Sequence, residues 1–405
     1  MFELDAVQTV AFGGLVLLLG YALCRYIPLL SRYNLPEPVV GGLVVALASW
    51  WAFSQGSSLY TLDTSLQQPL MIAFFTTIGL NASLSLLRVS LMPVLVFLGL
   101  SIFFAIAQNL IGIGVASAFG LNPLFGVLAG SATLTGGPAT GLAFAPMFEA
   151  AGLVGAESIA VTSAMAGIIL GGVIGGPVIT KLIQQQKVLT PGKKDNDNEV
   201  DLPGPNPQRV HIENDGDREF NALKSIIILL LLLWVGGFIS QGFTAIGLTL
   251  PAYIGAMLAG AILRNVDDLT GWFKLSVHTL EMIGNVCLAL FLAVALMNLK
   301  LWELAGMGAP LLVNLVLQML AVAAFAWVIF KVMGRDYDAA VMGGGFIGFM
   351  LGTTANAMAV MRKLTARYGL APRAFLVAPL IGAFFIDFAN ALIITGFINF
   401  WTPAA

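Results

Sequence analysis

The sequence predicts an all-α polytopic membrane protein with two inverted repeats of five transmembrane helices, each repeat with a re-entrant hairpin. Three observations favour this fold. The 405 residues are 58% hydrophobic and only 10% charged, whereas a soluble domain carries about 25% charged residues. The apolar residues form runs of roughly 20, the length at which a helix crosses a bilayer. Two further runs are interrupted at corresponding places in the two halves of the chain.

A charged segment separates the two apolar halves. It is rich in Lys, Asp and Glu and contains four prolines, a composition typical of a solvated connector without a packed core. The sequence therefore predicts a first repeat over residues 1–183, a linker over 184–222 and a second repeat over 223–405.

Each half contains five apolar runs that are long enough to span a bilayer. In the first repeat they lie at about 6–27, 36–53, 66–87, 91–119 and 157–183. In the second repeat they lie at about 223–243, 248–266, 278–302, 308–334 and 375–401. Because five is odd, the two repeats have opposite orientations in the membrane.

Two stretches fit a simple span poorly. The segments at about 122–150 and 338–369 are rich in Gly, Thr and Ala, and each is broken in the middle, by Gly-Gly-Pro at 136–138 and by Gly-Thr-Thr at 352–354. A break in a membrane helix leaves backbone groups unpaired unless protein or a polar cavity satisfies them. We interpret both stretches as re-entrant hairpins, since paired breaks in inverted repeats are typical of the binding site of a secondary transporter.

The distribution of basic residues orients the chain. With these spans, all but Lys300 of the 19 Lys and Arg residues fall on one side of the membrane. Cytoplasmic loops collect Lys and Arg. The linker is therefore expected in the cytoplasm and both termini in the periplasm.

Several segments resemble bacterial sodium/glutamate symporters, in the same order along nearly the whole chain. They read YNLPEPVVGGL at 33–43, FFTTIGLNA at 74–82, LKLWEL at 299–304, YDAAV at 337–341 and GAFFID at 382–387. The resemblance implies sodium-driven import of glutamate through the inner membrane, with Na⁺ as coupling ion. It also implies a homodimer that works by an elevator motion.

Both hairpins depart from the family's usual pattern. The first usually reads Gly-Gly-His-Gly-Thr, and here residues 136–140 read Gly-Gly-Pro-Ala-Thr. The second usually has a histidine after its glycine, and here Phe346 follows Gly345. Glutamate, which the resemblance implies, is the first candidate substrate. Because of these departures, another amino acid or a dicarboxylate is the alternative.

The hairpins supply most of the candidate binding groups. Pro138 suits the first turn of a half-helix, whose N-terminus would direct free N–H groups and a positive dipole end at a carboxylate. The candidate substrate-binding residues are Ser131, Thr133, Thr135, Gly136, Gly137, Thr140, Thr353, Thr354, Asn356 and Arg362. The candidate sodium-binding residues, chosen for oxygen ligands, are Thr135, Gly352, Asn356, Asp387 and Asn390.

Asp387 is the most unusual acid, because it lies near the middle of the last expected span. A carboxylate there costs at least ~2.5 kcal/mol on insertion scales, so it needs a partner or a function. Sodium or a substrate ammonium group would supply one, and Asn390 lies three residues on, on the same helical face.

Other classes of protein are disfavoured. The net charge of −2 and the lack of a basic stripe argue against nucleic-acid binding. With two histidines and no nucleophile motif, an intramembrane enzyme has little support. A channel remains an alternative, although channels usually repeat one filter sequence around a pore, and these two hairpins differ.

Overall fold

The computed structural model of the chain describes residues 2–28, 30, 35–57, 59–85, 91–191, 215–245, 250–304 and 306–401. In these ranges the chain is almost entirely helical, apart from one short parallel pair of strands. A helix pairs its backbone N–H and C=O groups within the segment, as the bilayer core requires. The expected all-α polytopic class is confirmed.

The first half of the chain forms strands β1 (Phe2–Leu4) and β2 (Tyr60–Leu62) and helices α1 (Ala6–Tyr26), α3 (Glu37–Ser54), α4 (Gln67–Leu80), α5 (Leu91–Ala118), α6 (Pro123–Val127), η2 (Leu128–Ala132), α7 (Gly137–Ala150) and α8 (Ala156–Gln185). The second half forms α9 (Asp215–Ala245), α10 (Ala252–Thr270), α11 (Val277–Met297), η3 (Leu301–Leu304), α12 (Gly308–Val332), α13 (Tyr337–Met350), α14 (Thr354–Tyr368), α15 (Pro372–Leu380), η4 (Ile381–Phe385) and α16 (Ile386–Trp401). Segments η2 and η4 are π-helical, and η3 is a 3-10 helix.

Each of the ten expected spans coincides with helix, although the details differ. Within the described residues, seven helices are long and apolar enough to cross a membrane: α1, α3, α5, α8, α9, α11 and α12. Helix α4 has only 14 residues and ends at Leu80 instead of 87. Helix α10 carries the charges of Arg264, Asp267 and Asp268 near its end. The last span, α15 to α16, contains a π-helical turn.

Helix α9 begins at Asp215, inside the segment expected to be a connector. The helical parts of the chain therefore extend into both ends of the expected linker, and residues 192–214 lie outside the described ranges.

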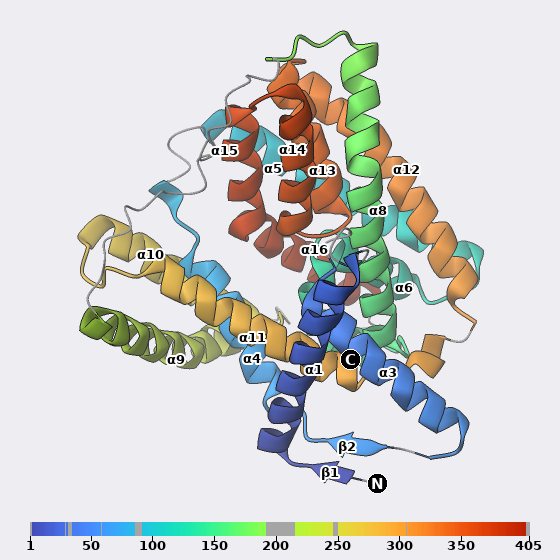
Figure 1. Ribbon diagram of the computed structural model, residues 1–405, viewed down its shortest axis with the longest axis vertical. Helices are drawn as coiled ribbons and strands as arrows, with labels where there is room; N and C mark the ends of the chain where they lie inside the picture. The colour runs from blue at the N-terminus through green and yellow to red at the C-terminus, as the bar shows by residue number, and fades with distance from the viewer. Residues whose placement is uncertain are drawn as a thin grey trace.

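The helices form two packed groups, and each group mixes the two halves of the chain (Figure 1). The first group contains α1, α3 and α4 with α9, α10 and α11. The second contains α5 to α8 with α12 to α16. Contacts between the groups are sparse and lie mainly where α7 meets α11 and where η4 meets α4. The short η3 segment packs on α3 of the first group and on α8 of the second.

Glycines allow the closest helix crossings in the first group. A methyl group at Gly20 of α1 would collide with the backbone carbonyl of Glu37 on α3. A methyl group at Gly236 of α9 would collide in the same way with the backbone of Ala256 on α10. Small residues at such positions let membrane helices approach closely, where lipid gives little hydrophobic drive for association.

The Gly20 crossing gives a stability prediction. Gly20→Ala should destabilise the folded protein by roughly 1–3 kcal/mol, the usual cost of overpacking. Gly14→Ala, in the same helix, meets nothing within 4 Å and should stabilise by roughly 0.5–1 kcal/mol, since glycine weakens helices. Thermal unfolding of both variants in detergent tests this. Equal midpoints for the two variants would show that the crossing does not need the glycine.

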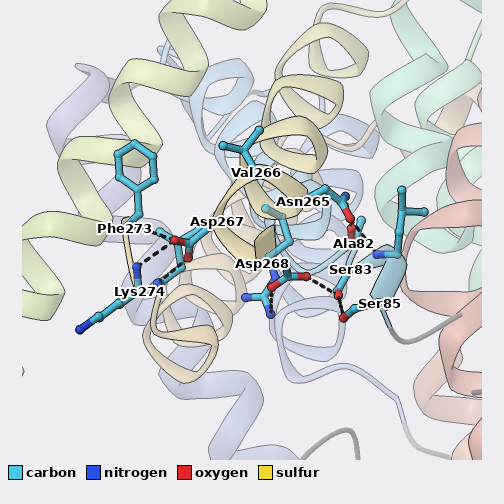
Figure 2. Close-up of polar contacts among 12 residues, drawn as sticks. Ala82, Ser83, Ser85, Asn265, Val266, Asp267, Asp268, Phe273 and Lys274 are labelled. Atoms are coloured by element: carbon cyan, nitrogen blue, oxygen red, sulfur yellow. Dashed lines mark hydrogen bonds and ion pairs between the residues drawn. The ribbon is translucent and has the colours of Figure 1, made fainter. Parts of the chain in front are cut away.

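A polar cluster holds the ends of α4 and α10 together (Figure 2). The side chain of Asn265 accepts from the N–H of Leu84 at 2.9 Å and donates to the carbonyl of Ala82 at 2.9 Å. The Ser83 hydroxyl donates to the carboxylate of Asp268. Asn265 thus accepts one hydrogen bond from the backbone after α4 and donates one to it. These bonds fix the direction in which the chain leaves this short helix.

Candidate functional site

The two interruptions that the sequence predicts are both present, and they face each other. Helix α7 begins at Gly137 with Pro138 in its first turn, as the sequence predicts, and α14 begins at Thr354 with Thr353 as its N-cap. A methyl group at Gly137 would lie 3.1 Å from Cγ2 of Thr353 and 3.4 Å from the carbonyl oxygen of Gly352. Two helix N-termini from different halves of the chain therefore meet.

This meeting point suits a negatively charged ligand. The first N–H groups of a helix have no partner within the helix, and its dipole is positive at that end. Gly137 has a φ of +69°, a conformation that glycine adopts without strain. The absence of a side chain at this position also lets a ligand approach the backbone.

Amide side chains pair the backbone of the first broken segment, η2. Oδ1 of Asn109 on α5 accepts from the N–H of Ser131 at 2.8 Å. The amide of Asn314 on α12 donates to the carbonyl of Ala129 at 2.7 Å, and that of Asn390 on α16 donates to the carbonyl of Ser131 at 2.9 Å. A break in a membrane helix requires such partners.

Gln108 joins the first break to the second. Its Nε2 donates to the carbonyl of Met350, the last residue of α13, at 2.8 Å. Its Oε1 accepts from the hydroxyl of Thr135 at 2.5 Å. Nε2 of Gln318 on α12 donates to the backbone carbonyl of Gln108 at 2.7 Å. All three polar side chains are buried, so the network holds the two breaks in a fixed relation.

Asn314 and Gln318 were not among the candidates from the sequence. The available signal was their spacing, because residues four apart lie on one face of a helix. Such a pair of amides in an apolar span indicates polar neighbours, but the sequence cannot say which neighbours they are.

The network gives a second stability prediction. Gln108→Leu keeps the approximate volume but leaves the Met350 carbonyl and the Thr135 hydroxyl without this partner, which should cost about 1–3 kcal/mol. Gln185→Leu, at the exposed end of α8, should change stability by less than about 0.5 kcal/mol. Thermal unfolding compares the two. An unchanged midpoint for Gln108→Leu would mean that the breaks are held by other contacts.

The last span has a π-helical turn, η4, that the sequence did not predict. Pro379 lacks an N–H and cannot make the usual helical bond. The hydroxyl of Thr354, at the start of α14, donates to the carbonyl of Gly382 in η4 at 3.1 Å. Single π-turns of this kind often occur at functional sites. The second break is thus in direct contact with a third irregular segment.

Asp387 lies directly after this π-turn, in the first turn of α16. Its side chain is half-buried. Among the described residues, no hydrogen-bond donor and no cationic side chain pairs with its carboxylate. An acid in this position is therefore available to a ligand.

Asn356 connects the second break to α8. Its Nδ2 donates to the carbonyls of Ile168 at 3.1 Å and Gly348 at 3.3 Å. A methyl group at Gly172 would lie 3.3 Å from Oδ1 of Asn356. The glycines of α8 therefore make room for this side chain as well as for close packing.

Several buried oxygens around the breaks have no hydrogen-bond partner among the described residues. They are Oγ of Ser131, Oε1 of Gln318, Oδ1 of Asn356 and Oδ1 of Asn390. Buried polar atoms are normally paired. Hydroxyl and amide oxygens are ligands of hard cations, so the donor set fits a sodium ion.

The remaining candidates are placed less favourably. The hydroxyl of Thr133 donates to a backbone carbonyl of its own segment at 2.8 Å. Gly136 and Thr140 face each other, since a methyl group at Gly136 would lie 2.6 Å from Cβ of Thr140. Arg362 is exposed and lies eight residues after Thr354, roughly 12 Å along the helix. The structure does not bring it to the break.

Broken helices that meet among buried, partly unpaired oxygens define a class of protein. With seven helices in the described residues able to cross a bilayer, the chain is a polytopic membrane transport protein. The irregular backbone lies where other helices supply partners and ligands can be bound.

Comparison with known proteins gives the family. The family model described as sodium/glutamate symporter matches residues 2–370. The chain is 41% identical over 399 residues to the sodium/glutamate symporters of Escherichia coli (strain K12) and Shigella flexneri, covering 97% of each chain. It is 39% identical to that of Haemophilus influenzae, with the same coverage. The chain belongs to the sodium/glutamate symporter family, a family of transporters, which confirms the resemblance seen in the sequence.

Proposed function

We propose that the protein is a secondary active transporter that imports glutamate together with sodium. The observation that carries the proposal is the identity of about two residues in five, over 97% of both chains, with relatives named sodium/glutamate symporters. The paired helix breaks give this function a physical site. The changed residues in the hairpins, Pro138 and Phe346, leave another amino acid or a dicarboxylate as alternative substrates.

In this proposal the substrate carboxylates bind at the facing N-termini of α7 and α14. Gly137 leaves room for the ligand, and Thr353 contributes a hydroxyl beside it. Sodium binds among oxygens from η2, α14 and α16, with Ser131, Asn356 and Asn390 as the principal ligands. Each of these three has a buried oxygen without a partner among the described residues. Asp387 supplies the negative charge.

We also infer the inverted repeat, with residues 1–183 related to 223–405 and each broken segment entering the membrane as a re-entrant hairpin. Helix packing supports this: α1 packs on α3 as α9 packs on α10, and α3 packs on α11 as α10 packs on α4. Pro36 precedes α3 as Pro251 precedes α10.

The orientation proposed is that of a bacterial inner-membrane protein with its linker, about 184–222, in the cytoplasm and both termini in the periplasm. The basic residues support it. Single cysteines at Asn196 and Ala405 can be treated with an impermeant thiol reagent on intact spheroplasts. Labelling is expected at Ala405 alone, and labelling at Asn196 would reverse the orientation.

An elevator motion within a homodimer is the transport mechanism that we propose. The two packed groups of helices support it, because they touch at few places and the candidate site lies within the second group. That group can then carry the site across the membrane as one body, while the first group remains fixed.

Uptake into proteoliposomes tests the function. With labelled glutamate outside, an inward sodium gradient should drive accumulation above the external concentration, and replacement of sodium by potassium should abolish it. Competition by unlabelled aspartate, glutamine and succinate identifies the substrate class. Flux that only equilibrates and does not saturate would indicate a channel instead.

A further inference from the structure

A basic cavity lies between the C-terminal parts of α8 and α14, away from the helix breaks. Its volume is about 490 Å³. Lys181 of α8 and Lys363 and Arg367 of α14 line it, together with the polar side chains of Thr180 and Gln184. In the part of the chain that the structure describes, no carboxylate lines it. Figure 1 shows the C-terminal ends of α8 and α14 at the same end of the molecule.

Gly176 and Pro177 of α8 line the less polar part of the cavity. A methyl group at Gly176 would meet nothing within 4 Å, so the space beside the helix is open. The ring of Pro177 is exposed and removes one backbone donor from the wall. The wall is thus apolar at one end and basic at the other.

No carboxylate of the described residues forms an ion pair with these three cations. Ion pairs among the described residues join Arg264 to Asp268, Lys300 to Glu303 and Arg373 to Asp336, and none involves the cavity. Like charges on one wall repel each other, and an anion between them relieves that repulsion.

The helix dipole does not account for the cluster. A cation in the last turn of a helix is stabilised by the negative end of the dipole, and Arg367 is in the last turn of α14. Lys363 lies one turn further back, and the last turn of α8 contains no basic residue, so Lys181 lies outside it. The preference of cytoplasmic ends for Lys and Arg places all three on this side of the membrane, but it does not gather them around one cavity.

We propose that this cavity binds the phosphate of an anionic phospholipid. Basic pockets between transmembrane helices bind anionic lipid headgroups. Lys181, Lys363 and Arg367 would hold the phosphate oxygens, and Thr180 and Gln184 would hydrogen-bond the headgroup or glycerol. The proposal depends neither on the transported substrate nor on the helix breaks.

The surface of α8 identifies the phosphate as that of a lipid. Val173, Pro177 and Lys181 are spaced by four residues, so they lie along one face of the helix. All three are exposed, Val173 at 46%. An acyl chain can follow this apolar face while its phosphate occupies the basic end. Free inorganic phosphate would gain nothing from the apolar part.

The test uses the purified full-length protein in a neutral detergent, with thermal unfolding as the readout. Dioleoylphosphatidylglycerol should raise the midpoint in a saturable way, whereas dioleoylphosphatidylcholine and inorganic phosphate should not. The triple variant Lys181→Gln, Lys363→Gln, Arg367→Gln should raise the half-saturating phosphatidylglycerol concentration roughly a hundred-fold. Gly176→Phe, which fills the cavity and keeps the charges, should also weaken binding at least ten-fold.

Matched controls separate the cavity from general surface charge. The triple variant Arg25→Gln, Lys274→Gln, Arg335→Gln removes the same charge from exposed positions elsewhere, and Gly237→Phe places the same ring in open space on α9. Both should bind the lipid as the unmodified protein does. Equal weakening by both triple variants, or no weakening by Gly176→Phe, would overturn the proposal. A saturable shift with inorganic phosphate that depends on the cavity residues would overturn its lipid part.

Discussion

Gly137→Val should lower the affinity for glutamate roughly ten- to hundred-fold, and the apparent sodium affinity should fall with it. A β-branched residue at a φ of +69° is strained by about 1–3 kcal/mol. Its Cβ would also press on Cγ2 of Thr353 at 3.1 Å and push the two helix N-termini apart. Calorimetric binding of glutamate at several sodium concentrations, on equal amounts of folded protein, measures both effects.

Gly152→Val is the matched control for this change. Gly152 follows α7, the helix that Gly137 begins, and has a φ of +88° with nothing within 4 Å of its missing Cβ. Valine there shares the backbone strain and not the collision, so stability should fall while affinity is kept. If Gly137→Val and Gly152→Val bind alike, α7 does not line the site.

Asp387→Asn should abolish sodium-dependent uptake while the protein remains folded. The carboxylate lies beside a π-helical turn without a cationic partner among the described residues, and a charge in the membrane costs at least ~2.5 kcal/mol. In the proposed site, the amide removes the negative charge that would hold sodium. Initial uptake rates over a range of sodium concentrations, with thermal unfolding of the same samples, measure the effect.

Asp387→Glu is the companion variant, since it keeps the charge and shifts it by one methylene group. It should transport with a lower sodium affinity and a measurable maximal rate. An Asp387→Asn protein with an unchanged sodium dependence and maximal rate would make this acid structural.

The helix breaks could be predicted from the sequence, because the residues that cause each break lie at the break itself. Glycine permits the positive φ that a break needs, and a proline directly after it suits the first turn of a helix, so Gly136, Gly137 and Pro138 predict the start of α7 on their own. Thr353 and Thr354 predict the start of α14 similarly, because a threonine hydroxyl can cap a helix. The number of apolar runs followed from length and composition alone.

What the sequence missed depends on contacts between distant segments. In the sequence, Asn314 is only a polar residue in an apolar helix. Its role becomes visible in the fold, where α12 lies beside η2 and the Asn314 side chain pairs with the backbone of η2. The π-turn at η4 involves the hydroxyl of Thr354, 28 residues earlier. Arg362 shows the same limit, since its charge suggested a carboxylate ligand, whereas the structure places its side chain on the exposed surface of α14.

The central claim is that the meeting helix breaks bind glutamate and sodium together. Isothermal titration of the purified protein with glutamate, at sodium concentrations spanning three orders of magnitude, tests it most directly. Because coupling between two ligands is reciprocal, glutamate affinity should rise with sodium, and sodium affinity should rise by the same factor in saturating glutamate. A glutamate affinity that is independent of sodium would contradict a joint site.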